Sequence, residues 1–431
     1  MAGMNRFVVR EFQAPGLIAQ PGEVLVPTEI GDPVRGRLRC PAAPLVVGSL
    51  RRKGRLVRSV TSPPFQDRQY DGDGAVLFVA TCQLHEGATA ALAAAAAPAD
   101  RLAVAVACSA VEEWAAVLGT RRLVLPGAGP WCEGAQRALA SAGNAVAANA
   151  DGRGRGVHIY GQLAATEEAA SELASRGAVF GTSLPDIPSG DVIVFAAHGV
   201  APQVREEAVA RGLEIVDATC PLVAMAQSQA RELADRGDQL VLIGQPDHPA
   251  AAAIASHADG AAAIVATAAG TAAVQVTDAR RVSYLLQPGI PVEDSAPVAT
   301  ALRSRFPAVR GPHPDGFCYA ASDRADSIRA VASGAGLVLI LGAPESADVR
   351  QLAGLARDCG ARAQAVADVG EITPAMLTGI ASLGIAESTS ARAGLAAEVT
   401  AALSGLGPVS VLRRQVKTTV DGQPAVLPTD G

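Results

Sequence analysis

Three cysteines are spaced almost evenly along the chain, and each stands at the start of a predicted helix. They are Cys132, Cys220 and Cys318, and each is followed by an amphipathic run, such as PLVAMAQSQARELADRG after Cys220. The amino terminus of a helix carries a partial positive charge, which favours a thiolate over a thiol. Three thiolates brought together form a soft metal site with one ligand missing. The pattern suggests an iron–sulfur cluster with one open iron, which could bind a substrate as well as pass electrons.

The elements that must position these cysteines belong to an α/β fold. From about residue 121 onward, short apolar runs such as DVIVFAAHG, QLVLIGQ and GLVLILGA alternate with amphipathic runs such as ADVRQLAGLARDCG. Apolar strands alternating with amphipathic helices predict mainly parallel sheets with helices on both faces. Glycine and small polar residues follow these runs, at the strand ends where α/β folds usually bind ligands.

The alternation divides the chain into segments. We predict three small α/β domains at about 121–210, 211–310 and 311–410, and each contributes one of the three cysteines. Residues 1–120 form an N-terminal α/β extension, which could supply substrate recognition, a docking surface or a second activity. The polar, Pro- and Gly-containing residues 411–431 form an extended tail.

The composition excludes several classes of function. The net charge is −6, and no basic stripe is present, so nucleic acid is not an expected partner. No apolar stretch reaches the roughly 20 residues of a membrane helix, and MAGMNRFVVREFQAPG at the start lacks the apolar core of a signal peptide. The seven scattered cysteines do not form a disulfide framework. We therefore expect a reduced, cytoplasmic protein with no membrane partner.

Four strings occur in a fixed order along the chain: FAAHGV (195–200), DATCPLV (217–223), GQPDHP (244–249) and GFCYAASDR (316–324). Together they resemble the 4-hydroxy-3-methylbut-2-enyl diphosphate reductase (LytB) family over roughly 121–410. In that family three cysteines hold a [4Fe–4S] cluster at the centre of three α/β domains. The open iron binds an allylic hydroxyl, which is removed with two electrons and protons. The resemblance therefore implies a pseudo-threefold trefoil around a central cluster and an iron–sulfur oxidoreductase of isoprenoid biosynthesis.

The cysteine motifs of the family are all present. PGAGPWCEGAQRA supplies Cys132, although the usual GFC has become PWC, DATCP supplies Cys220 and GFCY supplies Cys318. The resemblance implies that these three residues bind the cluster. Electrons would come from a ferredoxin or flavodoxin, because GAGP (127–130) lacks the spacing of a dinucleotide-binding loop.

The small-molecule site keeps part of the family pattern. The resemblance implies that the substrate is contacted by His198, His248, Gln287, Ser346, Asp348 and Ser390. A third diphosphate-binding histidine of the family is replaced by Ala165. The threonines of a Gln-Thr-Thr motif become Pro288 and Gly289. Asp348 replaces an asparagine and brings negative charge towards a diphosphate, which is unfavourable unless it is protonated or turned away.

A further departure concerns proton delivery. The family has His-Pro-Glu, and that glutamate delivers the proton that lets hydroxide leave as water. This chain has His248-Pro249-Ala250, and a methyl group cannot act as a general acid, a role worth about 10²–10⁴ in rate. Asp247 is the nearest carboxyl in the sequence, so His248 and Asp247 are the candidate catalytic residues.

Three functions are compatible with these residues. The first is the reductive dehydroxylation of an allylic substrate, either the isoprenoid diphosphate or a diverged, less phosphorylated analogue. The second is a non-catalytic or regulatory relative that binds a cluster, which Ala250 favours. The third is a zinc site made of the three cysteines with His198 or His248 as fourth ligand. The long, even spacing of the cysteines favours a cluster over zinc.

Overall fold

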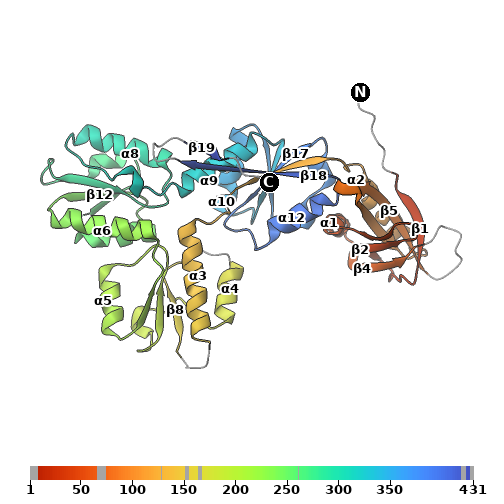
Figure 1. Cartoon of the computed structure of the whole chain (residues 1–431), viewed down its shortest axis with the longest axis horizontal. Coiled ribbons are helices and arrows are strands. Elements are labelled where there is room, and N and C mark those ends of the chain that lie inside the picture. Colours follow the sequence, from red (N-terminus) through yellow and green to blue (C-terminus); the bar gives the residue numbers. More distant parts are fainter. Residues whose placement is uncertain are drawn as a thin grey trace. The chain divides into compact units, whose positions relative to one another are not determined.

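The structure is a computed structural model of the 431-residue chain. It describes residues 8–65, 74–127, 129–150, 155–163, 167–260, 262–418 and 424–427. The chain forms two compact units, which Figure 1 shows coloured along the sequence. Unit 1 consists of Met1–Gly127, Ile328–Arg414 and Pro428–Gly431, and unit 2 consists of Ala128–Ser327 and Gln415–Leu427.

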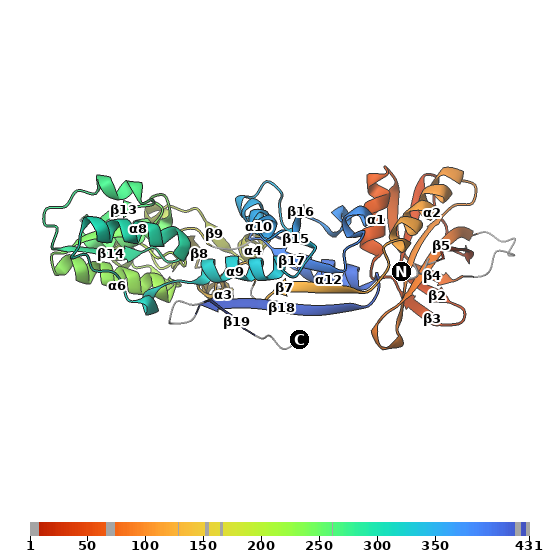
Figure 2. The ribbon, with the colours of Figure 1, turned by 90° about the horizontal axis from the view of Figure 1, so that it is seen from above.

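The first part of unit 1 is a mainly antiparallel sheet. Its strands are β1 (Arg10–Pro15), β2 (Glu23–Asp32), β3 (Gly36–Arg39), β4 (Leu56–Pro64), β5 (Gly74–Gln83) and β6 (Thr89–Ala96). They are ordered β1-β5-β6-β2-β3, and β4 pairs with β2 in parallel. Two helices, α1 (Ala43–Arg52) and α2 (Arg101–Ala115), lie side by side along this sheet (Figure 2). The alanine side chains of β6 are small and buried, so α2 can pack closely on that strand.

The second part of unit 1 is a parallel sheet ordered β16-β15-β17-β7-β18. Its strands are β7 (Arg121–Pro126), β15 (Leu337–Leu341), β16 (Arg362–Val366), β17 (Ser382–Glu387) and β18 (Val409–Thr418). The helices α10 (Ala347–Asp358), α11 (Pro374–Leu377) and α12 (Leu395–Ser404) alternate with these strands. All five residues of β15 are buried, as expected for a central parallel strand that is covered on both faces. The segment after residue 410 begins as part of β18, which pairs with β7.

The two sheets of unit 1 share one hydrophobic core. The same cluster of buried side chains includes Leu25 and Trp114 from the N-terminal part and Leu339 and Leu395 from the later part. Residues that lie hundreds of positions apart in the sequence therefore stabilise each other.

Unit 2 contains two further parallel sheets with helices between their strands. The first has the order β11-β10-β8-β9 and is built from β8 (Val157–Tyr160), β9 (Ala178–Phe180), β10 (Val192–Phe195), β11 (Glu214–Asp217) and the helices α3 (Glu133–Ala148), α4 (Glu167–Ser175) and α5 (Pro202–Ala210). The second has the order β13-β12-β14 and is built from β12 (Gln239–Ile243), β13 (Ala262–Val265), β14 (Val282–Leu286) and the helices α6 (Pro221–Asp235), α7 (Pro249–Ala255) and α8 (Val292–Arg305).

The helix α9 (Ala320–Ala332) follows in the chain, and Pro424–Leu427 form β19, which pairs with the end of β18. The predicted α/β class with mainly parallel sheets is confirmed. None of the helices in the described ranges has the length and apolar character needed to cross a bilayer.

Candidate functional site

The three predicted cysteines all lie in unit 2, close to the starts of helices. Cys132 is the residue that precedes α3, and Cys220 is the residue that precedes α6. Cys318 lies two residues ahead of α9. The backbone at Cys132 is extended (φ −68°, ψ 162°), so the chain turns from a loop into the helix at this residue. Each thiol therefore lies near the positive end of a helix dipole.

The sulfur atoms of these cysteines lie in one small region of unit 2. A Cβ atom placed on Gly134, in the first turn of α3, would lie 2.7 Å from Sγ of Cys220 and 3.9 Å from Sγ of Cys132. The pKa of the Cys318 thiol is raised, mainly by burial. The negative charges of Cys132 and Cys220 raise it further, so both lie near Cys318. Two of the thiols are partly buried and Cys132 is exposed, so a bound group could be reached from solvent.

Two backbone amides support the sulfur of Cys318. The N–H groups of Ala320 and Gly289 hydrogen-bond to it and partly offset the rise in its pKa that burial causes. Gly289 has a φ of +93°, a backbone conformation that a threonine would adopt only with strain. Glycine at this position therefore allows the backbone conformation in which its N–H reaches a predicted cluster ligand.

Three thiolates are ligands that suit an iron–sulfur cluster or a single soft metal ion. Within the described ranges, no three histidine, cysteine or acidic side chains are grouped closely enough to hold one ion. A zinc site needs its ligands at about 2.0–2.3 Å from one centre. A cluster binds each thiolate on a different iron, so its ligand sulfurs stand farther apart. The three thiols near helix starts are the residues that could hold such a cluster.

The two predicted histidines contact each other in unit 2. The rings of His198, which follows β10, and His248, which precedes α7, have centroids 4.8 Å apart and meet edge to face. Burial lowers the pKa of both side chains, and the nearby His248 lowers the pKa of His198 further. Nδ1 of His248 accepts a hydrogen bond from the backbone N–H of Ala250 (3.2 Å). The buried Nδ1 of His198 has no hydrogen-bond partner among the described atoms, so it is available to a ligand.

The position of the missing glutamate is buried. Ala250 lies in the first turn of α7 and has no exposed surface. It belongs to the same hydrophobic cluster as Val223, Leu242 and Ile254. Asp247 is an exposed residue of the turn between β12 and α7. Its catalytic role stays a prediction. The substituted third histidine position, Ala165, lies outside the described residues.

The side chain of Gln287 is hydrogen-bonded within the protein. Its side chain is buried, and its Oε1 accepts a hydrogen bond from the backbone N–H of Gln245 (2.8 Å). A Cβ on Gly244 would lie 2.7 Å from the same oxygen, so this loop needs glycine. The bond ties the residue after β14 to the loop after β12. Gln287 therefore positions the segment that leads to His248, and its predicted contact with substrate stays a prediction.

The remaining predicted residues lie in unit 1, on the loops that follow β15 and β17. Ser346 immediately precedes α10, and Asp348 lies in the first turn of that helix. Oδ2 of Asp348 accepts hydrogen bonds from the backbone N–H (2.7 Å) and hydroxyl (3.0 Å) of Thr389. Oγ of Ser390 accepts a hydrogen bond from the backbone N–H of Ala343 (3.1 Å). The carboxylate is thus turned onto the second loop and ties it to the start of α10.

Sequence reasoning did not find two glycines of this site, Gly134 and Gly289. Gly134 leaves room for a cysteine sulfur, and Gly289 donates a backbone hydrogen bond to one. Gly134 stands two residues after Cys132 inside a predicted helix, where glycine is costly, and that conflict was the available signal.

Comparisons with known proteins agree with these motifs. The family described as LytB protein matches residues 124–404. The 4-hydroxy-3-methylbut-2-enyl diphosphate reductase of Azoarcus sp. (strain BH72) is 32% identical over 281 residues, covering 65% of this chain and 89% of the relative. The enzyme of the same name from Alcanivorax borkumensis is 34% identical, covering 64% and 89%.

Solved structures share the fold. The E-1-hydroxy-2-methyl-but-2-enyl-4-diphosphate reductase of Plasmodium falciparum superimposes with a TM-score of 0.59 at 19% identity, covering 68% of this chain and 92% of that one. In all of these matches about a third of this chain is left over, and the family match begins only at residue 124. The chain therefore belongs to the LytB protein family of oxidoreductases, as its cysteine and histidine motifs predicted.

Proposed function

We propose that this chain is a reductase that removes the hydroxyl group of an allylic alcohol, using a [4Fe–4S] cluster held by Cys132, Cys220 and Cys318. The observation that carries the proposal is the meeting of Cys132 and Cys220 at Gly134, with Cys318 close enough to feel the charge of both, in a chain of the LytB family. When bound, the cluster would supply single electrons and an iron able to accept an oxygen ligand. The net reaction takes up two electrons and two protons: one C–O bond breaks and one C–H bond forms, and the hydroxyl leaves as water with the second proton.

The protein residues would bind and orient the substrate. His198 and His248 lie edge to face, and because burial lowers their pKa values they are neutral near pH 7. A neutral imidazole still donates one hydrogen bond from a ring N–H, so the pair can recognise an anionic or hydroxylated ligand without carrying full charge. Asp247, in the turn next to His248, is the carboxyl that we propose for proton delivery.

The substrate is either 4-hydroxy-3-methylbut-2-enyl diphosphate, the compound in the relatives' names, or a less phosphorylated analogue. Asp348 supports the analogue only through its net charge near the start of α10, because its carboxylate is turned onto Thr389 by hydrogen bonds. A ferredoxin or flavodoxin would supply the electrons. We propose that the protein works in the reducing cytoplasm, where thiol ligands stay available to a cluster.

The test is anaerobic reconstitution of the full chain with iron and sulfide. We expect iron and sulfide in the ratio of a cubane cluster, an absorption band near about 400 nm, and turnover by reduced ferredoxin. The diphosphate, the monophosphate and the free alcohol should be compared as substrates. Cys318→Ser should lose both the band and the turnover. Cys359→Ser, at the carboxyl end of α10 and in no motif, should keep both.

A second candidate is a non-catalytic or regulatory relative, and buried Ala250 is the observation that favours it. The same assay separates the two functions. A stable cluster without turnover of any of the three substrates would support the regulatory function and contradict the reductase.

A further inference from the structure

A separate cleft lies in unit 1, where the N-terminal part meets the later part. Its volume is about 360 Å³, within the range of small-molecule sites. One wall is α1, and the other is the turn around Asp368–Glu371. Thr28 of β2 and Ser59 of β4 contribute hydroxyl groups. The wall formed by α1, β2 and β4 lies outside the segment that matches the LytB family, whereas the turn around Asp368–Glu371 lies inside it. None of these residues belongs to the reductase site described above.

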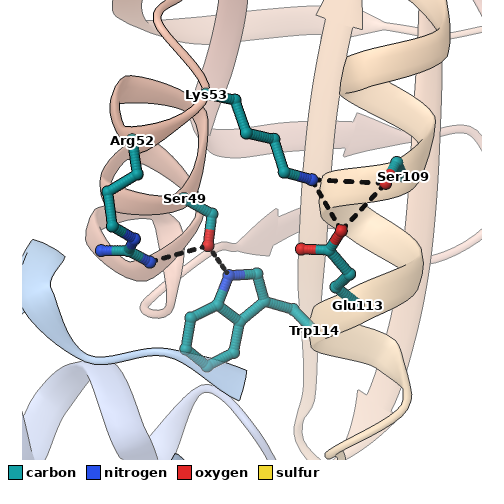
Figure 3. Close-up of polar contacts among 6 residues, drawn as sticks. All are labelled: Ser49, Arg52, Lys53, Ser109, Glu113 and Trp114. Carbon is teal, nitrogen blue, oxygen red and sulfur yellow. Dashed lines mark hydrogen bonds and ion pairs between the residues drawn. The ribbon is translucent and has the colours of Figure 1, made fainter. Parts of the chain in front are cut away.

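Hydrogen bonds and an ion pair hold the side of α1 that faces α2. Figure 3 shows that Oγ of Ser49 accepts hydrogen bonds from Nε1 of Trp114 (3.0 Å) and from the guanidinium of Arg52 (3.1 Å). Lys53 pairs with Glu113 of α2 at 2.6 Å. These bonds fix α1 against α2 and leave another face of α1 to line the cleft.

Hydrogen bonds also join α1 to the turn that forms the opposite wall of the cleft. Arg52 donates to the backbone carbonyl of Gly370 and to that of Ile372 (3.2 Å). A Cβ on Gly48 would lie 2.0 Å from the carbonyl oxygen of Gly370, so the two walls meet through glycine backbone. The two walls are therefore held together through backbone groups and the side chain of Arg52.

Opposite charges line the cleft without neutralising each other. Arg51, on α1, makes no hydrogen bond or ion pair to any side chain in the described ranges. Across the cleft, Oε2 of Glu371 accepts from the backbone N–H of Ala367 (2.8 Å), and Oδ1 of Asp368 accepts from that of Gly370 (2.8 Å). Within the described part of unit 1, neither carboxylate pairs with Arg51. Asp368 pairs instead with Arg392 (3.6 Å), and the guanidinium of Arg52 is bound to the carbonyls of the facing turn. The exposed Arg51 and Glu371 therefore hold opposite charges on opposite walls of the cleft.

We propose that this cleft binds a small zwitterion, namely a free α-amino acid. Its carboxylate would bind the unpaired guanidinium of Arg51, which is suited to bidentate contact. Its ammonium group would bind Glu371 on the other wall. The side chain of the ligand would lie against Ala43 and Val47 of α1. A ligand with only one charge would leave one of the two walls unsatisfied, so a zwitterion is favoured over a simple anion or amine.

The test is calorimetric titration of the reconstituted full chain with the twenty proteinogenic L-amino acids, one at a time. We expect saturable binding of at least one. The methyl ester and the N-acetyl derivative of that amino acid, each lacking one charge, should bind at least about tenfold more weakly. Equal binding of either derivative would overturn the proposal, as would the absence of saturable binding by all twenty.

Single substitutions test whether the amino acid binds in this cleft. Arg51→Gln and Glu371→Gln should each weaken it by about tenfold or more, and both keep the volume of the original side chain. Arg35→Gln, in the turn between β2 and β3, removes an exposed arginine of the same unit and should leave binding unchanged. Binding that survives either cleft substitution would place the ligand elsewhere and would contradict the assignment. Cluster content and turnover are measured in parallel, so failure of this site is distinguished from failure of the reductase.

Discussion

Gly134 lies directly against the sulfur of Cys220. A Cβ at this glycine would come within 2.7 Å of Sγ and 3.1 Å of Cβ of the cysteine, closer than ordinary packing allows. We therefore expect Gly134→Ala to displace a cluster ligand and to reduce cluster affinity by about 10- to 100-fold, the usual effect of disturbing the surroundings of a metal ligand. Iron and sulfide per chain after anaerobic reconstitution measure the effect.

Gly143→Ala is the matched control in the same helix. A Cβ there would meet only Cδ2 of Leu173, at 4.0 Å. It should raise the free energy of unfolding by about 0.5–1 kcal/mol, because alanine favours helix over glycine, and should leave the iron content unchanged. If Gly134→Ala also keeps its full iron content, the three thiols do not share a cluster.

A second prediction concerns the carboxylate at the start of α10. In Asp348→Asn the side-chain oxygen can still accept the hydrogen bond from the backbone of Thr389, while the negative charge is lost. We expect the affinity for the isoprenoid diphosphate to rise roughly tenfold, because one repulsive charge is removed. Asp358→Asn, at the other end of the same helix, changes the net charge equally and should have no effect. Unchanged diphosphate affinity in Asp348→Asn would mean that this loop does not contact the anion.

The chemistry-bearing residues were easier to predict than their surroundings. Cys132 and Cys220 stand at helix starts as expected, since a cysteine before an amphipathic run is a local pattern. Local patterns could not reveal that Gln287 bonds to the backbone of Gln245, because this depends on how β12 and β14 pair. The shared core that joins Trp114 to Leu339 depends on contacts between distant residues, which no window of sequence contains. The domain boundaries proposed from sequence stay a prediction.

A third prediction tests the missing acid. Ala250→Glu introduces a carboxyl where the family carries one, and we expect turnover of the diphosphate to rise by up to about 10²-fold. Stability should fall by roughly 2–4 kcal/mol, because Ala250 is fully buried and the new group is larger and polar. Ala253→Glu, at another buried position of α7, should destabilise similarly without a gain in turnover. Equal rates for the two variants would argue that position 250 has no catalytic role.

A fourth prediction concerns the junction within unit 1. Gly48→Ala should destabilise the chain by about 1–3 kcal/mol, because its new methyl group would overlap the backbone carbonyl of Gly370. Gly354→Ala, in α10, has open space around its Cβ and should stabilise by about 0.5–1 kcal/mol instead. Chemical denaturation measures both values. A stabilising effect of Gly48→Ala would show that the two parts of unit 1 do not pack closely at this point.

The histidine pair makes stability depend on pH. Burial lowers the pKa of His198 and of His248 below the ordinary value of 6.5, and the nearby His248 lowers the pKa of His198 further. Between that value and the lower folded-state pKa values, the unfolded chain binds more protons than the folded chain. The free energy of unfolding is therefore highest above pH 6.5 and decreases as the pH falls below it.

Replacing both histidines by glutamine, which does not titrate, should flatten this decrease. His313→Gln, at an exposed position, should keep the slope of the unmodified chain. Urea denaturation of the three proteins between pH 5 and pH 8 measures the slopes, a range that spans the ordinary histidine pKa. Because a neutral pair becomes charged only at acidic pH, the same titration reports when the pair begins to offer positive charge to an anionic substrate. An identical slope in the double variant would mean that the protonation of this pair is not linked to folding. The neutrality of the pair near pH 7 would then have a cause other than burial in the folded chain.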